Sequence, residues 1–333
     1  MELKNLQIIR GIAALMVVTN HFLSGTYAGI FKLNGGFGVD IFFVLSGFLM
    51  IHTLRPEKTP LNFFFSRVRR IYPLYIILSL PLILTTIALK DNYFFIGNIL
   101  LLPGFGFEKY HMANGPAWTL VYEMIFYSIF TIALIFSKNK IITCAFVCIV
   151  IFICVYSISG HARMGWVNIG YILGDALMIN FALGCILGCI YPMMKDRISI
   201  RFMVFFAIFI LICYIALDTL SSYDRFFKFG IPALIIVLLA TITQSGSGFV
   251  YNIFHKIGDA SYSIYLSHIY ITFIYHDFVK VNGNNWVISQ YSSIAFAVAS
   301  VIFGLFIHLA IEKTIDSRLR MINKNNNRVR ILS

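Results

Sequence analysis

Ten apolar runs of 15 to 24 residues constrain this chain more than any other feature of its sequence. A helix of about 20 residues crosses a bilayer core of roughly 30 Å, because it rises about 1.5 Å per residue. Hydrophobic residues make up 59% of the 333 residues and charged residues 12%, so a soluble fold could not bury so much apolar surface. The sequence therefore predicts an all-α, polytopic membrane helix bundle. The runs are 8–30, 37–54, 71–89, 118–136, 141–159, 169–192, 202–219, 229–243, 259–279 and 288–311.

An eleventh apolar stretch, 93–107, decides the topology. It is short for a span and is interrupted by three glycines and a proline. If it does not cross and the N-terminus is cytoplasmic, 19 of the 26 Lys and Arg residues lie inside. If it crosses, the basic clusters at 138–140 and 195–201 fall outside, against the enrichment of cytoplasmic loops in Lys and Arg. We therefore predict about ten transmembrane helices, both termini in the cytoplasm, and an outer loop at 93–117.

The rest of the chain adds no separate domain to this prediction. Residues 1–315 are expected to form the transmembrane domain, and 316–333 a basic, Asn-rich cytoplasmic tail near anionic headgroups. The net charge of +12 is spread over short loops, which indicates orientation in the membrane rather than nucleic-acid binding. The six cysteines lie inside apolar runs, without the spacing of a metal site or a disulfide pair. Arg10 and His21 interrupt the first run, which favours a retained span over a signal peptide.

Ionisable residues inside the apolar runs are the main functional signal. A charge at the bilayer centre costs about 2.5–3.5 kcal/mol on insertion scales, so such a group usually faces the bundle interior and serves a function. The competing explanation for each is a structural ion pair or a satisfied buried hydrogen bond. The residues concerned are His21, Asp40, Glu123, Asp175, His268 and His308.

His21 and Glu123 are predicted to lie at similar depth. Thirteen helical residues place His21 about 20 Å above the cytoplasmic face, and Glu123 lies about 8 Å below the outer face. An imidazole beside a carboxylate can accept a proton near neutral pH while the carboxylate fixes its tautomer. We therefore expect His21 to act as a base oriented by Glu123.

A group of arginines is predicted at the opposite, cytoplasmic end. Arg10 lies three turns below His21 on the same helix and so returns close to the same face. Arg67 and Arg70 are spaced i, i+3, with Arg69 between them, just before another span. Guanidinium groups suit phosphate, so this layout predicts a polyphosphorylated donor at the inner face. Topology alone is the competing explanation for the loop arginines.

Three further residues carry weaker signals. Asp175 lies among glycines with GxxxG spacing, which favours close helix packing or hydrogen bonding over catalysis. His268, about 14 Å from the inner end of its span, could line the same cavity as His21 or be structural. For His308 the sequence offers no functional argument.

Several segments, taken in order, resemble the membrane-bound acyltransferase-3 family nearly end to end. Arg10 and His21 reproduce the R-x10-H pattern of its first span, and four other segments match its remaining signatures. Any one match is weak, but all of them in the right order are specific. The four segments are 38–48 (GVDIFFVLSGF), 67–75 (RVRRIYPLY), 118–123 (WTLVYE) and 261–268 (SYSIYLSH).

This resemblance implies a bacterial inner-membrane O-acetyltransferase that uses acetyl-CoA and needs no metal. The acceptor implied is a lipid-linked or polymeric polysaccharide, because the 118–123 segment looks most like exopolysaccharide and O-antigen acetylases, including those of serotype-converting phages. The resemblance carries over His21 and Glu123 as catalytic residues, and a covalent acetyl-enzyme on His21 or Ser46 stays open. The residues expected to bind the donor are Arg10, Arg67, Arg70 and Arg69. The further residues expected to line the cavity are Asp40, Ser46, Trp118, Tyr122 and His268.

Two other functions compete with this prediction. Ten spans with buried His, Asp and Glu are also typical of a multi-pass transporter of a glycan lipid or acyl donor, although transporters often show two matched halves and none is visible here. A purely structural partner in a polysaccharide assembly complex would carry the insertion cost of these groups without evident benefit.

Overall fold

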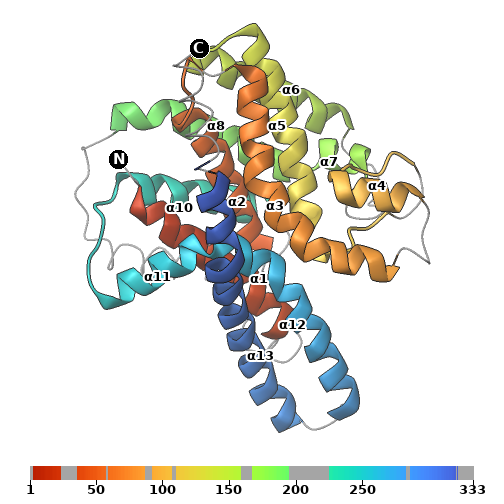
Figure 1. Ribbon diagram of the computed structural model, residues 1–333. Coiled ribbons are helices and arrows are strands. Elements are labelled where there is room, and N and C mark those ends of the chain that lie inside the picture. Colours follow the sequence, from red (N-terminus) through yellow and green to blue (C-terminus); the bar gives the residue numbers. More distant parts are fainter. Residues whose placement is uncertain are drawn as a thin grey trace.

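The structure, a computed structural model, describes residues 3–23, 36–57, 59–86, 92–106, 110–158, 167–194, 225–282, 286–319 and 321. Every regular element within these ranges is helical (Figure 1). The first half holds α1 (Lys4–Leu23), α2 (Gly36–His52), α3 (Pro60–Thr86), α4 (Asn92–Leu100), η2 (Gly115–Ala117), α5 (Trp118–Phe136) and α6 (Lys140–Ile158). The second half holds α7 (Ile169–Gly174), α8 (Leu177–Met194), η3 (Phe226–Gly230), α10 (Ile231–Ile242), α11 (Phe249–Asp259), α12 (Ser261–Asn282), α13 (Trp286–Ile307) and η4 (His308–Glu312).

The apolar runs are mostly helical where the structure describes them, but the run at 169–192 breaks at Asp175 into α7 and α8. Six helical stretches are long and apolar enough to cross a membrane, and two shorter apolar helices, Gly36–His52 and Phe226–Ile242, accompany them. Helix α12 covers the run predicted at 259–279, whereas the run at 202–219 lies outside the described residues. The all-α membrane architecture is thus confirmed, while ten crossings and the cytoplasmic position of the termini stay predictions.

The boundary predicted for the tail falls inside a helix. The helical stretch that contains α13 continues through η4 to Leu319, so the first residues assigned to the tail extend the last helix. The remainder of 316–333, apart from residue 321, lies outside the described residues. Of the six cysteines, the five in the described ranges are free thiols, and Cys213 lies outside them.

The doubtful stretch 93–107 does not form a span. Helix α4 has nine residues, too few to cross a bilayer, and the chain leaves it at Leu101 with a positive φ of 53°. The buried Asn98 side chain then fastens the loop, donating to the Phe94 carbonyl at 2.9 Å and accepting from the Ala113 N–H at 2.7 Å. The loop that follows α4 is therefore folded onto the protein, which satisfies backbone groups that lipid could not.

Small residues shape the most extensive helix contact among the described residues, between α2 and α8. A Cβ on Gly184 would lie 2.1 Å from the Val44 carbonyl oxygen, and one on Gly47 would lie 2.1 Å from the Phe181 carbonyl oxygen. Gly188 faces Ile51 and Phe48 in the same way. The predicted GxxxG packing of α8 is thus confirmed at Gly184 and Gly188, where backbones approach as small residues permit.

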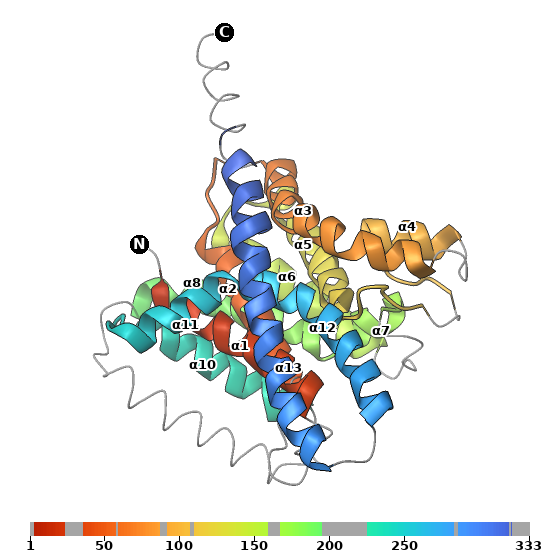
Figure 2. The same cartoon turned by 60° about the horizontal axis from the view of Figure 1, so that its bottom comes forward.

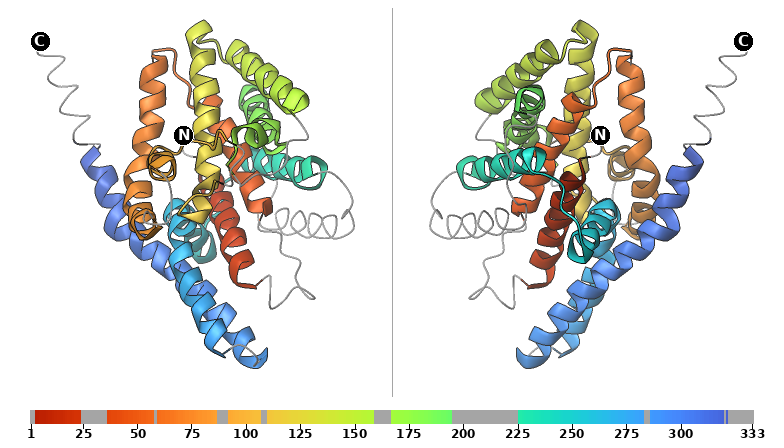
Figure 3. Two further views of the ribbon diagram at one scale, coloured as in Figure 1. Left: turned by 90° about the vertical axis from the view of Figure 1, so that its right-hand side faces the viewer. Right: turned by 90° about the vertical axis from the view of Figure 1, so that its left-hand side faces the viewer.

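Helix α1 lies at the centre of the bundle, where it packs against α2, α11, α12 and α13 (Figure 2). Helices α12 and α13 form a hairpin that projects beyond the other helices (Figure 3). Gly11 and Gly258 allow α1 and α11 to touch, since a Cβ on Gly258 would lie 1.8 Å from the Gln7 carbonyl oxygen. Residues 7–10 of α1 are thereby fixed beside the ends of α11 and α12, where the candidate site lies.

Candidate active site

A cavity of about 1010 Å³ opens among α1, α2, α3, α5, the α11–α12 junction and η4. We call it the arginine cavity. Its volume lies at the upper end of the range of roughly 300–1,000 Å³ that is typical of small-molecule sites. Four basic and four acidic side chains line it, so its formal charges nearly cancel: Arg10, Arg69, Arg70, Lys313, Glu123, Asp259, Glu312 and Asp316.

Arg10 is the basic group that reaches the cavity from the central helix. Its Nη1 donates to the Gln7 Oε1 at 3.1 Å, one turn back on α1. Arg70, Glu312, Glu123 and Asp259 act on it electrostatically, but within the described residues no carboxylate oxygen lies within 4.0 Å of its guanidinium. Arg10 is therefore surrounded by charge without being locked into an ion pair.

Helix α3 brings two of its three predicted donor-binding arginines to the cavity. Ser66, Arg69 and Arg70 line the cavity, and their i, i+3, i+4 spacing places them on one face. Arg67 does not line it: its Nη2 donates to Thr53 Oγ1 at 3.2 Å and its guanidinium lies 5.3 Å from the Phe63 ring. The prediction for Arg67 is therefore corrected, because its helical position directs it to the α2–α3 connection.

Glu123 lies in the arginine cavity rather than beside His21. Its Oε2 accepts a hydrogen bond of 2.8 Å from the Tyr127 hydroxyl, one turn further along α5. Arg70, Arg10 and Arg67 are the cations that act on it. The prediction that Glu123 contacts His21 is therefore wrong. Two side chains at equal depth do not meet when their helices direct them to different sides.

The deep end of the cavity is closed by aromatic and hydroxyl side chains. The Tyr265 hydroxyl donates to the Pro116 carbonyl at 2.9 Å and lies 2.9 Å from Thr119 Oγ1. Phe42 packs edge-on against the Tyr265 ring, with centroids 5.9 Å apart. These contacts tie α12 to the start of α5 and fix the wall that separates the cavity from His21.

His21 stands beyond this wall, next to a second imidazole. Its ring centroid lies 4.9 Å from that of His268, and the His268 ring lies 6.0 Å from that of Tyr265. His21 is exposed, whereas His268 is completely buried. We expected Arg10 and His21 to face one shared tunnel, but His21 is not on the cavity walls, and the Tyr265–His268 layer lies between them.

Sequence reasoning missed a polar cluster on the last helix. Glu312 Oε2 lies 2.6 Å from His308 Nδ1 and accepts a 2.6 Å hydrogen bond from Ser263 Oγ. Both His308 and Glu312 line the arginine cavity, on the π-helical segment η4, and π-bulges are frequent at functional sites. The i, i+4 spacing of an imidazole and a carboxylate after an apolar run was the available signal.

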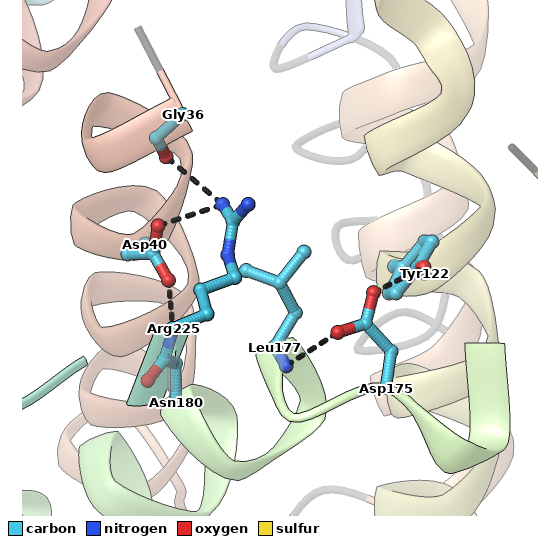
Figure 4. Close-up of polar contacts among 7 residues, drawn as sticks. All are labelled: Gly36, Asp40, Tyr122, Asp175, Leu177, Asn180 and Arg225. Atoms are coloured by element: carbon cyan, nitrogen blue, oxygen red, sulfur yellow. Dashed lines mark hydrogen bonds and ion pairs between the residues drawn. The ribbon is translucent and has the colours of Figure 1, made fainter. Parts of the chain in front are cut away.

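Asp40, predicted as a cavity residue, belongs to a closed ion-pair cluster instead (Figure 4). Its Oδ2 lies 2.8 Å from Arg225 Nη2, and its Oδ1 accepts from Asn180 Nδ2 at 2.7 Å. Arg225 also donates to the Gly36 carbonyl at 3.2 Å. Asp40 is 1% exposed and does not line the arginine cavity, so it joins α2, α8 and η3.

The other predicted cavity residues divide in the same way. Ser46 lines the arginine cavity, but Trp118 and Tyr122 do not. The buried Tyr122 hydroxyl donates to Asp175 Oδ2 at 2.8 Å, and Asp175 Oδ1 accepts from the Leu177 N–H at 3.0 Å (Figure 4). This confirms the hydrogen-bonding interpretation of Asp175, which caps the start of α8. Trp118 packs edge-on against Tyr122.

Comparison with known proteins agrees with this architecture. A family model described as an acyltransferase domain matches residues 3–313. The chain is 26% identical to "Exopolysaccharide production protein ExoZ" of Rhizobium meliloti, over 71% of this chain and 76% of that protein. It is 27% identical to "Putative O-acetyltransferase SACOL0978" of Staphylococcus aureus, over 81% of this chain and 50% of that protein. The chain thus spans about half of the staphylococcal relative, and no solved structure matches it.

Proposed function

Since the chain belongs to the acyltransferase-3 family, we propose that it transfers an acetyl group from acetyl-CoA to a sugar hydroxyl of a surface polysaccharide. The family and its apolar helices make the chain a membrane acyltransferase, which sets the transporter alternative aside. Relatives named for exopolysaccharide production and as O-acetyltransferases support a polysaccharide acceptor and an acetyl group. An O-antigen or exopolysaccharide acceptor, and a place in a bacterial inner membrane, are parts of the same proposal.

The arginine cavity carries the proposal for the donor. Acetyl-CoA bears phosphate groups at one end and a thioester at the other, and guanidinium forks bind phosphate through paired N–H groups. Arg10, Arg69 and Arg70 supply such groups around a cavity large enough for a nucleotide. Arg10 makes no ion pair in the described structure, so its fork stays available to an incoming phosphate. This open guanidinium in a large cavity is the single observation on which the donor site depends.

His21 carries the proposed chemistry. Its ring accepts the proton of a sugar hydroxyl, and the resulting alkoxide attacks the thioester carbonyl carbon. The new C–O bond forms, the C–S bond breaks, and its electron pair leaves with sulfur. The CoA thiolate then takes the proton from the His21 imidazolium, so the products are the acetyl ester and free CoA thiol. Glu123 serves this reaction from the arginine cavity, where its carboxylate lies near Arg10 and Arg70 and helps to position their guanidinium groups.

The Tyr265–His268 layer adds one requirement to this mechanism. The acetyl arm of the donor has to pass from the deep end of the arginine cavity to His21, and this layer stands in its way. A rotation of these rings on donor binding would join the two compartments. The same layer limits the access of water to the thioester of the bound donor, which water would hydrolyse.

The proposal is tested on the polysaccharide itself. Cells that carry an unmodified surface polysaccharide are compared with and without expression of this chain, using mass spectrometry of the purified repeat units and proton NMR. We expect a mass increase of one acetyl group per modified repeat, with a new acetyl methyl signal. In membranes from the same cells, acetyl-CoA should release free thiol when the polysaccharide is present. An unchanged polysaccharide in several acceptor strains, with no thiol release, would contradict the proposal.

A further inference from the structure

His268 is the buried polar side chain that the proposed reaction leaves without a task. It is 0% exposed, and among the described residues neither of its ring nitrogens has a partner in normal hydrogen-bond geometry. The carbonyls of Ile264 and Tyr265 approach the ring from the preceding turn of α12. A buried group without good partners is unfavourable for folding, so a role elsewhere is needed to account for it.

The neighbour of His268 is the proposed catalytic base. The rings of His268 and His21 lie 4.9 Å apart between centroids and are tilted by 48°. A modest rotation of either ring brings two ring nitrogens within the roughly 2.7–3.2 Å of a hydrogen bond. His276 lies about two helical turns further along α12 and acts on His21 electrostatically. Tyr265 flanks His268 from the cavity side. None of these neighbours is a carboxylate.

We propose that His268 is a positioning residue that holds His21 through an imidazole–imidazole hydrogen bond and stabilises its protonated form. This inference rests on the proposed function, since it assigns His268 the place predicted for Glu123. Neutral imidazole has one donor and one acceptor nitrogen. Before transfer, His268 therefore donates to or accepts from His21 and fixes its ring orientation. When His21 takes the hydroxyl proton, His268 accepts a hydrogen bond from the imidazolium.

The burial of this position explains why an imidazole, and not a carboxylate, orients His21 here. A carboxylate beside His21 would be a charge that the membrane interior penalises, whereas neutral His268 provides an acceptor without a standing charge. Its helix is held by Tyr265, whose hydroxyl donates to the Pro116 carbonyl at 2.9 Å. The same contacts make His268 part of the layer between the arginine cavity and His21. The ring that rotates when the donor binds is therefore also the ring that positions His21.

The test uses three substitutions on α12 in the full-length membrane protein. His268→Leu removes both nitrogens at similar volume, and His268→Gln retains a donor and an acceptor. Thr272→Val is the matched control, because Thr272 is buried one turn away and, within the described residues, its hydroxyl bonds only to the His268 carbonyl at 3.0 Å. Each variant is assayed for amount in the membrane, thermal unfolding in detergent, acetyl transfer, and the pH dependence of kcat/KM.

We expect His268→Leu to fold and to lose roughly 10- to 100-fold in kcat, less than the 100- to 10,000-fold typical of removing an acid–base group itself. Because the His21 imidazolium loses its acceptor, His21 stays neutral to lower pH, and the acid limb of the kcat/KM profile should move to lower pH. His268→Gln should recover part of the rate, and Thr272→Val should match the parent in both readouts.

Two outcomes overturn the inference. His268→Leu could transfer acetyl at the parent rate, or it could lose rate with an unmoved acid limb and no recovery by His268→Gln, which would mark a packing role. Failure of the proposed function gives a different result, because the parent and Thr272→Val would then show no acetyl transfer at all.

Discussion

The Asp40 cluster and the arginine cavity both place charged side chains inside a membrane protein, yet they differ in how completely those charges are paired. Asp40 uses both carboxylate oxygens, one on Arg225 and one on Asn180. Arg10 has a single described hydrogen bond, to Gln7. A carboxylate with both oxygens bonded holds helices together, whereas a guanidinium that faces a cavity with unused donors is ready for a ligand. In this protein, the number of bonds that a charged side chain makes distinguishes structural from functional charges better than its burial does.

The two regions also differ in what surrounds them. Asp40 is enclosed by α2, α8 and η3, where glycines bring backbones into contact. The arginine cavity takes side chains from six helices (α1, α2, α3, α5, α11 and α12), from η4 and from the helical residues that follow it, which leaves about 1010 Å³ between them. Substitutions in the first region should therefore change stability, and those in the second should change donor binding.

The largest effect is expected from Asp40→Ala. It leaves the Arg225 guanidinium without its carboxylate, which costs about 3–5 kcal/mol for a fully buried pair. We expect about 2–3 kcal/mol here, because the Arg225 side chain is 35% exposed. Thermal unfolding of the purified protein in detergent measures it. The double variant Asp40→Ala/Arg225→Ala should recover part of the loss, and donor affinity of the folded fraction should be unchanged.

Arg10→Ala is expected to have the next largest effect, this time on the donor. Losing charge-assisted hydrogen bonds worth about 1.5–3 kcal/mol should weaken acetyl-CoA binding roughly 10- to 100-fold. The melting temperature should barely move, since the one hydrogen bond of Arg10 among the described residues goes to Gln7 on its own helix. Isothermal titration with acetyl-CoA provides the measurement, and Arg10→Lys should be intermediate. A collapse in stability with unaltered affinity would place Arg10 with Asp40, as a structural charge.

Arg70→Ala and Arg67→Ala form a matched pair on one helix. Arg70 lines the arginine cavity, whereas Arg67 bonds to Thr53 and covers the Phe63 ring. We expect Arg70→Ala to weaken donor binding about tenfold. Arg67→Ala should leave affinity unchanged and cost about 0.5–1 kcal/mol of stability, as an exposed cation–π contact does. Equal loss of affinity in both variants would restore the original prediction for Arg67.

The smallest predicted effect has the opposite sign. Glu312→Gln keeps the shape of a side chain that acts on Arg10 and accepts from Ser263 and His308, but removes a negative charge near the donor phosphates. Donor affinity should rise about two- to fourfold, because two unit charges about 10 Å apart interact by roughly 0.4–0.8 kcal/mol at an effective dielectric of about 40–80. Glu57→Gln, an exposed change outside the cavity, is the control. Weaker binding by Glu312→Gln would mean that its hydrogen bonds matter more than its charge.

The sequence predicted what depends on composition and distance along a helix. Apolar length predicted membrane helices, of which the described residues show six long enough to cross. Charge bias predicted that 93–107 does not cross, and the nine-residue α4 supports this. Arg10 and Arg70 were expected at one end of the bundle, and both line the arginine cavity. Helical rise fixes such positions along the bundle axis, because it is nearly constant.

What the sequence could not predict is the direction each side chain faces and the neighbour it meets. Arg69 lines the arginine cavity and Arg67 does not, because the two residues from Arg67 to Arg69 turn the helix by about 200°. Glu123 has the depth of His21 but bonds to Tyr127, while His21 meets His268 from a helix more than 240 residues later. The His308–Glu312 pair depends on a π-helical turn, which no apolar period reveals. These contacts are decided by tertiary packing.

One comparison tests the central claim most directly, namely that the donor is held by the arginine cavity and the acetyl group is transferred at His21. Purified parent, His21→Ala and Arg10→Ala proteins are measured side by side for acetyl-CoA affinity and for acetyl transfer to the polysaccharide at saturating donor. We predict that His21→Ala binds acetyl-CoA like the parent but transfers roughly 100- to 10,000-fold more slowly, whereas Arg10→Ala loses affinity and regains most of its rate at high donor concentration. Transfer by His21→Ala at the parent rate would contradict this assignment.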